Sequence, residues 1–205
     1  VADLLGVLAY GELTAFIRMA VDSDLAPTLA LKSSMAGLAH TEYVQYSQLI
    51  EHMGSRGIDA EAAMAPFVTP FAAYHEPRDW IEGLVKAFVG DGIAKDFYRE
   101  MSAFVDDETR AVMGLALDDE GQADFVVGVV RDTLKTDRTA AGRLSLWGRR
   151  LLGEALSQAQ AVAVERDAMS ALLVGGGVDL AEVGQMFARL TENHQKRMAL
   201  MGLTA

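Results

Sequence analysis

Carboxylate and amide side chains stand where the predicted helices of this chain should be apolar. In residues 36–52, Glu42 and Gln45 follow Leu38 and precede Leu49 at steps of three and four, so all four lie on one helical stripe. A buried, ionised carboxylate is strongly unfavourable unless it is paired or bound to a metal ion. The spacing therefore indicates a buried site in which Glu42 has a chemical use.

Other predicted helices bring matching groups. Glu12 interrupts the stripe of residues 2–22, and Asp96 lies beside the stripe of residues 93–104, where Glu100 competes with it for the inward position. A later helix repeats the three-residue spacing of a carboxylate and an amide. Four helices thus place a carboxylate at or beside their core stripe. The candidate metal ligands are Glu12, Glu42, Gln45, Asp96, Asp119 and Gln122.

This constellation resembles the ferritin-like di-iron carboxylate bundle, in which two helices each give one Glu and two give Glu-x-x-His. The resemblance covers residues 2–133. The runs AYGEL at 9–13, GDGIAKDFY at 90–98 and GEAL at 153–156 are similar to those of bacterial ferritin-like proteins grouped with the tRNA hydroxylase MiaE. The resemblance implies an all-α fold: a ferritin-like antiparallel four-helix bundle with two additional C-terminal helices.

The resemblance also implies a ligand set, from which this chain departs. By position, Glu12 and Asp96 become the lone carboxylates, while Glu42 with Gln45 and Asp119 with Gln122 become the paired ligands. Both expected histidines are glutamine, and two of the four glutamates are aspartate. The family implies two divalent ions, with iron as the metal; neutral amide oxygens suit manganese or magnesium better. The alternative is a metal-free site in which each Gln bridges neighbouring carboxylates.

Two functions follow from these alternatives. The resemblance implies a MiaE-like hydroxylase that uses a di-iron site and dioxygen on the isopentenyl group of 2-methylthio-isopentenyl-adenosine in tRNA. The loss of both histidines favours a metal-free ferritin-like scaffold that acts as a binding or interaction module. The sequence identifies no catalytic residue for either function.

Composition sets further bounds. The chain has 205 residues, 51% of them hydrophobic, and no cysteine, which suits one domain without disulfides or thiolate metal sites. No apolar run approaches membrane-spanning length, so we expect a cytoplasmic protein without membrane contact. The net charge of −11 argues against non-specific binding to nucleic acid. One local basic face either contacts tRNA phosphates or is a solvated helix surface. That face comprises Arg138, Arg143, Arg149 and Arg150. The sequence also leaves open whether the protein forms a homodimer.

The predicted organisation is a single domain, with the four-helix bundle in residues 1–136 and the two extra helices in residues 138–205. A proline-rich connection over residues 55–77 is expected to cross from one end of the bundle to the other, as ferritin-like topology requires. Gly90 and Gly92 predict a kink or bulge in the third bundle helix, with a plain break between two helices as the alternative.

Overall fold

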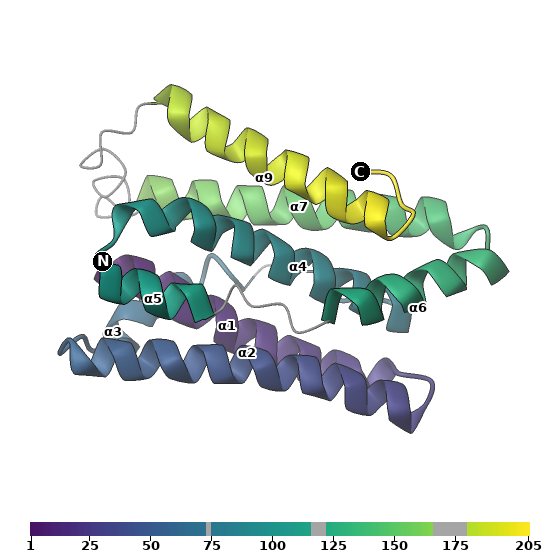
Figure 1. Cartoon of the computed structure of the whole chain (residues 1–205), viewed down its shortest axis with the longest axis horizontal. Helices are drawn as coiled ribbons and strands as arrows, with labels where there is room; N and C mark the ends of the chain where they lie inside the picture. Colours follow the sequence, from purple (N-terminus) through teal and green to yellow (C-terminus); the bar gives the residue numbers. More distant parts are fainter. Residues whose placement is uncertain (73–74, 116–121, 166–179) are drawn as a thin grey trace.

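All regular elements in the described part of the chain are helical, which confirms the all-α prediction. The computed structural model describes residues 1–72, 75–115, 122–165 and 180–205, with the backbone alone at 122, 161–165 and 180 (Figure 1). The α-helices are α1 (Ala2–Asp22), α2 (Leu29–Ser55), α3 (Ala60–Met64), α4 (Trp80–Met101), α5 (Asp107–Leu115), α6 (Gln122–Thr136), α7 (Ala140–Glu165) and α9 (Leu180–Leu200). Three short 3-10 helices are η1 (Ser23–Leu25), η2 (Ala65–Phe67) and η3 (Ser102–Phe104).

The helix directions follow ferritin-like topology. Along α1, Glu12 contacts Tyr98 and Asp22 contacts Lys86, so α1 and α4 run antiparallel. A short turn makes α2 antiparallel to α1, and α2 and α4 therefore run in the same direction (Figure 1). The connection over residues 56–79 must cross the length of the bundle between them, as the sequence predicts. The fourth helix is present as α5 and α6, and residues 116–121 between them lie outside the described part.

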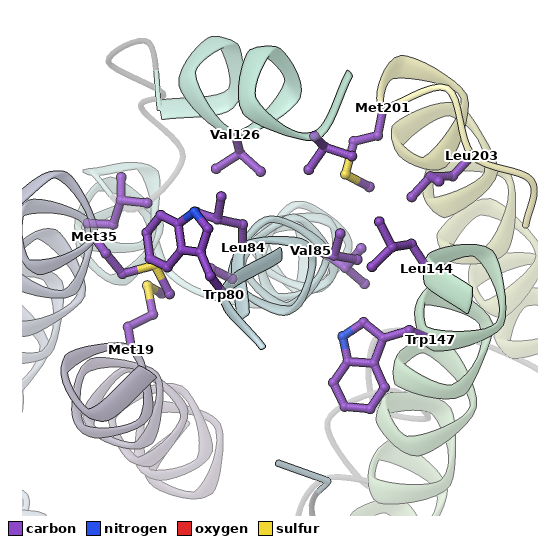
Figure 2. Packing of buried hydrophobic residues seen from close by; sticks show 14 of the residues in the cluster. Met19, Met35, Trp80, Leu84, Val85, Val126, Leu144, Trp147, Met201 and Leu203 are labelled. Carbon is purple, nitrogen blue, oxygen red and sulfur yellow. The ribbon is translucent and has the colours of Figure 1, made fainter. Parts of the chain in front are cut away.

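Helix α4 is the centre of the packing. It contacts α1, α6, α7 and α9. Figure 2 shows Leu84 and Val85 of α4 between Met19 and Met35 on one side and Leu144 on the other. A second apolar cluster lies toward the opposite end of α1 and α2, around Leu4, Leu5, Leu49, Met53, Phe67 and Met101. The two C-terminal helices are thus part of the core around α4.

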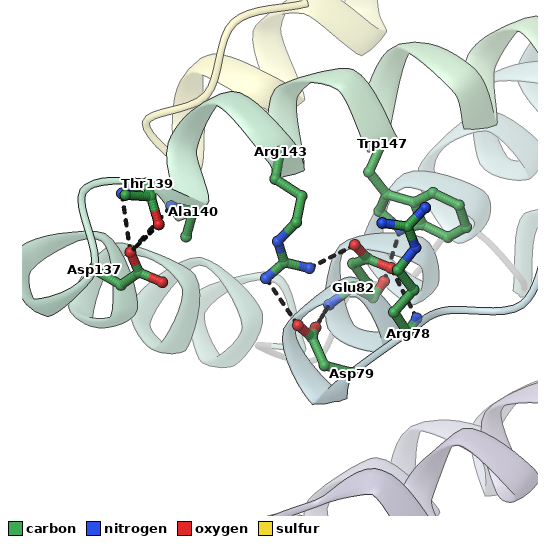
Figure 3. A network of polar contacts seen from close by, with 8 residues as sticks. All are labelled: Arg78, Asp79, Glu82, Asp137, Thr139, Ala140, Arg143 and Trp147. Atoms are coloured by element: carbon green, nitrogen blue, oxygen red, sulfur yellow. Dashed lines mark hydrogen bonds and ion pairs between the residues drawn. The ribbon is translucent and has the colours of Figure 1, made fainter.

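A polar network ties the start of α4 to α7. Asp79 caps α4 by accepting from the Glu82 amide at 2.9 Å. Arg143 of α7 reaches both carboxylates, with a 2.8 Å contact to Asp79, and the Trp147 indole donates to the Glu82 carbonyl at 2.9 Å (Figure 3). These bonds fix the rotation of α4 and thereby the direction in which its later residues point.

Helix α4 is one continuous helix from Trp80 to Met101, so the alternative of a plain break between two helices is wrong. A Cβ on Gly92 would lie 2.4 Å from Cδ of Arg197, whose guanidinium crosses the helix there to reach Asp96 at 2.6 Å. Gly92 therefore serves the close approach of α9. Gly90 has open space around it.

Helix α1 corrects one expectation about membranes. The segment Ala2–Leu25 has a mean hydropathy of 1.5 and is long and apolar enough to cross a membrane by length and composition. In the structure 44% of that apolar window is buried. Core helices of soluble proteins meet the same criterion, so the segment is weak evidence for a membrane span.

The glycine pair on α4 gives a matched test. We expect Gly92→Ala to lower the free energy of unfolding, because the new methyl displaces Arg197 from its buried pair with Asp96. Gly90→Ala should raise it by about 0.5–1 kcal/mol, because alanine is the better helix former and nothing obstructs the methyl. Urea unfolding of both variants measures this. Equal changes in the free energy of unfolding for the two variants would show that Arg197 does not need the space at Gly92.

His194 of α9 makes stability depend on pH. It is fully buried, and neither ring nitrogen has a hydrogen-bond partner in the described part of the chain. Burial, and then the charge of Arg197, lowers its pKa to about 4 from 6.5. Between pH 6.5 and pH 4, His194 is protonated in the unfolded chain but neutral in the folded chain. The free energy of unfolding therefore falls as pH drops through this range.

Replacing His194 should remove that dependence. We expect His194→Leu to remove a loss of up to about 3 kcal/mol in the free energy of unfolding over this pH window. The control His40→Leu, at an exposed position of α2, should keep the wild-type slope. Thermal melting from pH 7 to pH 4 measures the pH dependence of stability in both variants. An unchanged slope in His194→Leu would assign the acid sensitivity to other groups.

Candidate functional site

Two buried glutamates face each other where α1 meets α2. Glu12 and Glu42 are each 4% exposed and share a hydrogen bond. Burial raises the pKa of Glu12; burial, followed by the negative charge of Glu12, raises the pKa of Glu42 well above its usual value. Because this hydrogen bond raises the pKa of Glu42 and lowers that of Glu12, Glu42 is the donor and the Glu12 carboxylate accepts. The sequence prediction that Glu12 and Glu42 converge is confirmed.

Helix α4 supplies the other polar groups of this cluster. The Tyr98 hydroxyl donates to Glu12 Oε1, and burial raises the pKa of Tyr98 well above 10. Lys95 Nζ lies 3.0 Å from Asp91 Oδ2, and the charges of both residues act on the two glutamates. Asp91, Lys95 and Tyr98 recur at steps of four and three on one helix face. That spacing was the signal in the sequence that would have identified Asp91 and Lys95.

Asp96 is buried but belongs to a different contact. It lies about 140° around α4 from Asp91, at roughly 100° per residue. Its two oxygens pair with Arg197 at 2.6 Å and Arg99 at 2.9 Å, so it turns toward α9. The prediction that Asp96 joins Glu12 is therefore wrong, because Asp96 forms an ion pair with Arg197 of α9.

The remaining predicted ligands are placed only in part. Gln45 is 6% exposed, one turn after Glu42 on α2, as its stripe predicts. Asp119 lies outside the described residues. Gln122 begins α6, and its side chain lies outside the described part. Whether Asp119 and Gln122 approach Glu42 stays a prediction.

A cavity of about 330 Å³ lies beside the acid pair. Helices α1, α4, α7 and α9 form its walls, which are mainly apolar and include Leu8, Ile93 and Phe187. Glu12 and Glu42 line it, together with Asp91 and Tyr98, whereas Asp96 and Lys95 are not among its lining residues. The cavity thus has one acidic, hydrogen-bonding end in an otherwise apolar space.

A second polar group lies at the cavity wall away from the acid pair. His75, in the crossover connection, contacts the Glu154 carboxylate of α7 through Nδ1. Arg18 of α1 donates to the Phe71 carbonyl at 2.6 Å. These contacts hold the connection against α1 and α7. Glu154 of α7 thus has a partner in the connection.

The residues described here do not fit a di-iron centre. Within the described ranges, no group of three or more His, Asp or Glu side chains could hold a metal ion. Glu12 accepts hydrogen bonds from Glu42 and Tyr98, and the ammonium of Lys95 supplies positive charge to both glutamates. The carboxylate oxygens that would bind a metal ion thus already form hydrogen bonds with each other and with Tyr98, and they interact with the charge of Lys95.

The predicted basic face is partly occupied by contacts within the protein. Arg143 is held by the carboxylates at the start of α4 (Figure 3), and Arg149 donates to the Thr204 carbonyl at 3.3 Å. Arg138 and Arg150 are exposed. Phosphate binding by this face would therefore have to rest mainly on Arg138, Arg149 and Arg150.

A family model described as "Ferritin-like domain, actinomycetes" matches residues 1–176. The chain belongs to this ferritin-like family. The match begins at the start of α1 and extends past the end of α7, and it agrees with the all-α fold. A search among curated proteins finds none that matches.

The acid pair of this ferritin-like protein predicts a second pH effect, opposite in sign to that of His194. Because the folded pKa of Glu42 is raised above 4.5, its contribution to stability is complete below pH 4.5 and is lost as pH rises through the raised pKa. The slope for one proton is at most about 1.4 kcal/mol per pH unit. Glu42→Gln, which stays neutral and can still donate to Glu12, should lose this decline.

The control is Glu51→Gln, an exposed position on the same helix, which should keep the wild-type profile. Urea unfolding from pH 5 to pH 9 provides the free energies. If Glu42→Gln declines in parallel with the wild type, Glu42 does not carry a buried proton.

Proposed function

We propose that this ferritin-like protein binds a small, mostly apolar molecule without using a metal ion. The observation that carries the proposal is the cavity between α1, α4, α7 and α9, with the Glu12–Glu42 pair at one end. Its volume of about 330 Å³ is in the range of small-molecule pockets, roughly 300–1,000 Å³. Protein interiors seldom leave voids larger than a water molecule, so a space of this size supports binding.

Small residues keep the cavity open. Glycine or alanine faces it from three helices, where the packing of a bundle core usually places larger side chains. At Gly11 and Gly90 an added Cβ would meet nothing within 4 Å. The small lining residues are Gly11, Ala15, Ala87, Gly90, Ala94, Ala155 and Ala159. The cavity is therefore a consequence of the small residues in the sequences of α1, α4 and α7.

The polar end gives the ligand an orientation. Apolar walls supply affinity through area removed from water, while a few placed polar groups fix the direction of entry. Glu12 and Tyr98 meet at one end, and His75 and Glu154 lie at another part of the wall. A ligand with one polar group would thus be held with its apolar part toward α7 and α9.

A second candidate function is the MiaE-like hydroxylase. It is favoured by the position of Glu12 and Glu42 beside the cavity and by the resemblance of three sequence runs to that group. Its test is dioxygen uptake after addition of ferrous iron and reductant. Uptake that Glu12→Gln abolishes would support this candidate over the metal-free binding protein, while no uptake above buffer would oppose it.

A direct test of binding uses a neutral probe, n-octanol, in isothermal titration calorimetry. We expect one n-octanol per chain and a loss of at least about tenfold in affinity, or about 1.4 kcal/mol, in Ala155→Phe, whose ring fills the cavity. Ser157→Phe is the matched control, because it adds the same ring to the exposed face of α7.

The two variants separate cavity binding from adsorption. Equal affinity in wild type, Ala155→Phe and Ser157→Phe would mean that n-octanol binds elsewhere and would contradict the proposal. An Ala155→Phe chain that melts at the wild-type temperature and no longer binds would support it, since the fold is then intact and only the space is lost.

A further inference from the structure

The charges around the cavity do not balance at its acidic end. With one proton shared between Glu12 and Glu42, that end holds the negative charges of Glu12 and Asp91 against the single positive charge of Lys95. Among the described residues, one negative charge is therefore left over at this end. Lys95 pairs with Asp91 and does not line the cavity, so in the described part of the chain the Glu12 carboxylate accepts hydrogen bonds from the Tyr98 hydroxyl and the Glu42 carboxyl.

The basic side chains that line the cavity each meet an acceptor of the protein. Arg18 donates to the Phe71 carbonyl. Lys86 Nζ lies 2.6 Å from the Asp22 carboxylate, and His75 contacts a carboxylate of α7. The lining therefore favours positive charge in a ligand at the acid pair.

We propose that the cavity binds an organic cation: a mostly apolar molecule whose protonated amine pairs with Glu12 and Glu42. This inference rests on the proposed function, because it names the ligand class of the same cavity. An ammonium carries three donors and no acceptor, which matches an end made of carboxyl groups. Hydrogen bonds between an ammonium and a carboxylate are short and about twice as strong as neutral ones.

The same charges select against other ligands. A neutral alcohol can donate one hydrogen bond to Glu12 but leaves its charge uncompensated. A carboxylate ligand would add a second negative charge beside Glu12 in a region of low dielectric constant, where like charges repel strongly. The expected order of affinity is therefore ammonium, then alcohol, then carboxylate, for ligands with the same apolar chain.

The test compares n-octylamine, n-octanol and n-octanoate at pH 7 by isothermal titration calorimetry. We expect n-octylamine to bind at least about tenfold more tightly than n-octanol, a difference of about 1.4 kcal/mol, and n-octanoate to bind weakest. The chain's net charge of −11 attracts any cation, so the amine must also bind one per chain and lose affinity in Ala155→Phe.

Charge variants locate the preference. The ratio of amine to alcohol affinity should fall toward one in the double variant Glu12→Gln, Glu42→Gln, and should stay at the wild-type value in Glu51→Gln on the exposed face of α2. Lys95→Met should raise the ratio, because it removes a positive charge that acts on both glutamates. A gain of this kind cannot come from damage to the fold.

The outcomes keep this inference separate from the proposed function. If all three probes bind with one affinity and Ala155→Phe abolishes it, the cavity is a binding site but not one for cations, and the inference fails alone. If none binds in the cavity, the proposed function fails as well. Tighter binding of n-octanoate, or a lower ratio in Lys95→Met, would also overturn the inference.

Discussion

The hydrogen bond from Glu42 to Glu12 is the interaction on which the rest of the site depends. Two ionised carboxylates at this depth would repel each other and would each lose their hydration, so one must hold a proton. The shared proton removes one of the two charges, and the Tyr98 hydroxyl satisfies part of the other. The pair lies between two apolar clusters and joins α1, α2 and α4 at one level.

The position of α4 determines what this pair can do. Its network with Arg143 and Trp147 fixes its rotation, so that Asp91 and Tyr98 point toward the glutamates while Asp96 points toward α9. Helices α7 and α9 pack on α4, and small residues on α1, α4 and α7 leave the cavity between them. A ferritin-like frame thus holds an acid pair with a neighbouring lysine and an apolar space, the combination on which the proposed recognition of a cation rests.

The sequence predicted the parts of this arrangement that depend on local periodicity. The stripes of α1 and α2 placed Glu12 and Glu42 inward correctly, and the proline-rich connection gave the crossover topology. The choice between Asp91 and Asp96 could not be made locally, because it depends on Arg197, which lies about a hundred residues further on. The role of Gly92 could not be predicted for the same reason, since the glycine makes room for Arg197 from a distant helix.

The central claim is that Glu12 and Glu42 form a proton-sharing pair and not half of a metal centre. Anaerobic equilibrium dialysis of the purified chain against ferrous iron, and separately against manganese, tests it most directly. We expect no saturable binding of either metal ion at Glu12 and Glu42. Their carboxyl groups already share a hydrogen bond, and Lys95 supplies positive charge to both. Two ions per chain in the wild type, both lost in Glu12→Gln and retained in Glu51→Gln, would contradict it.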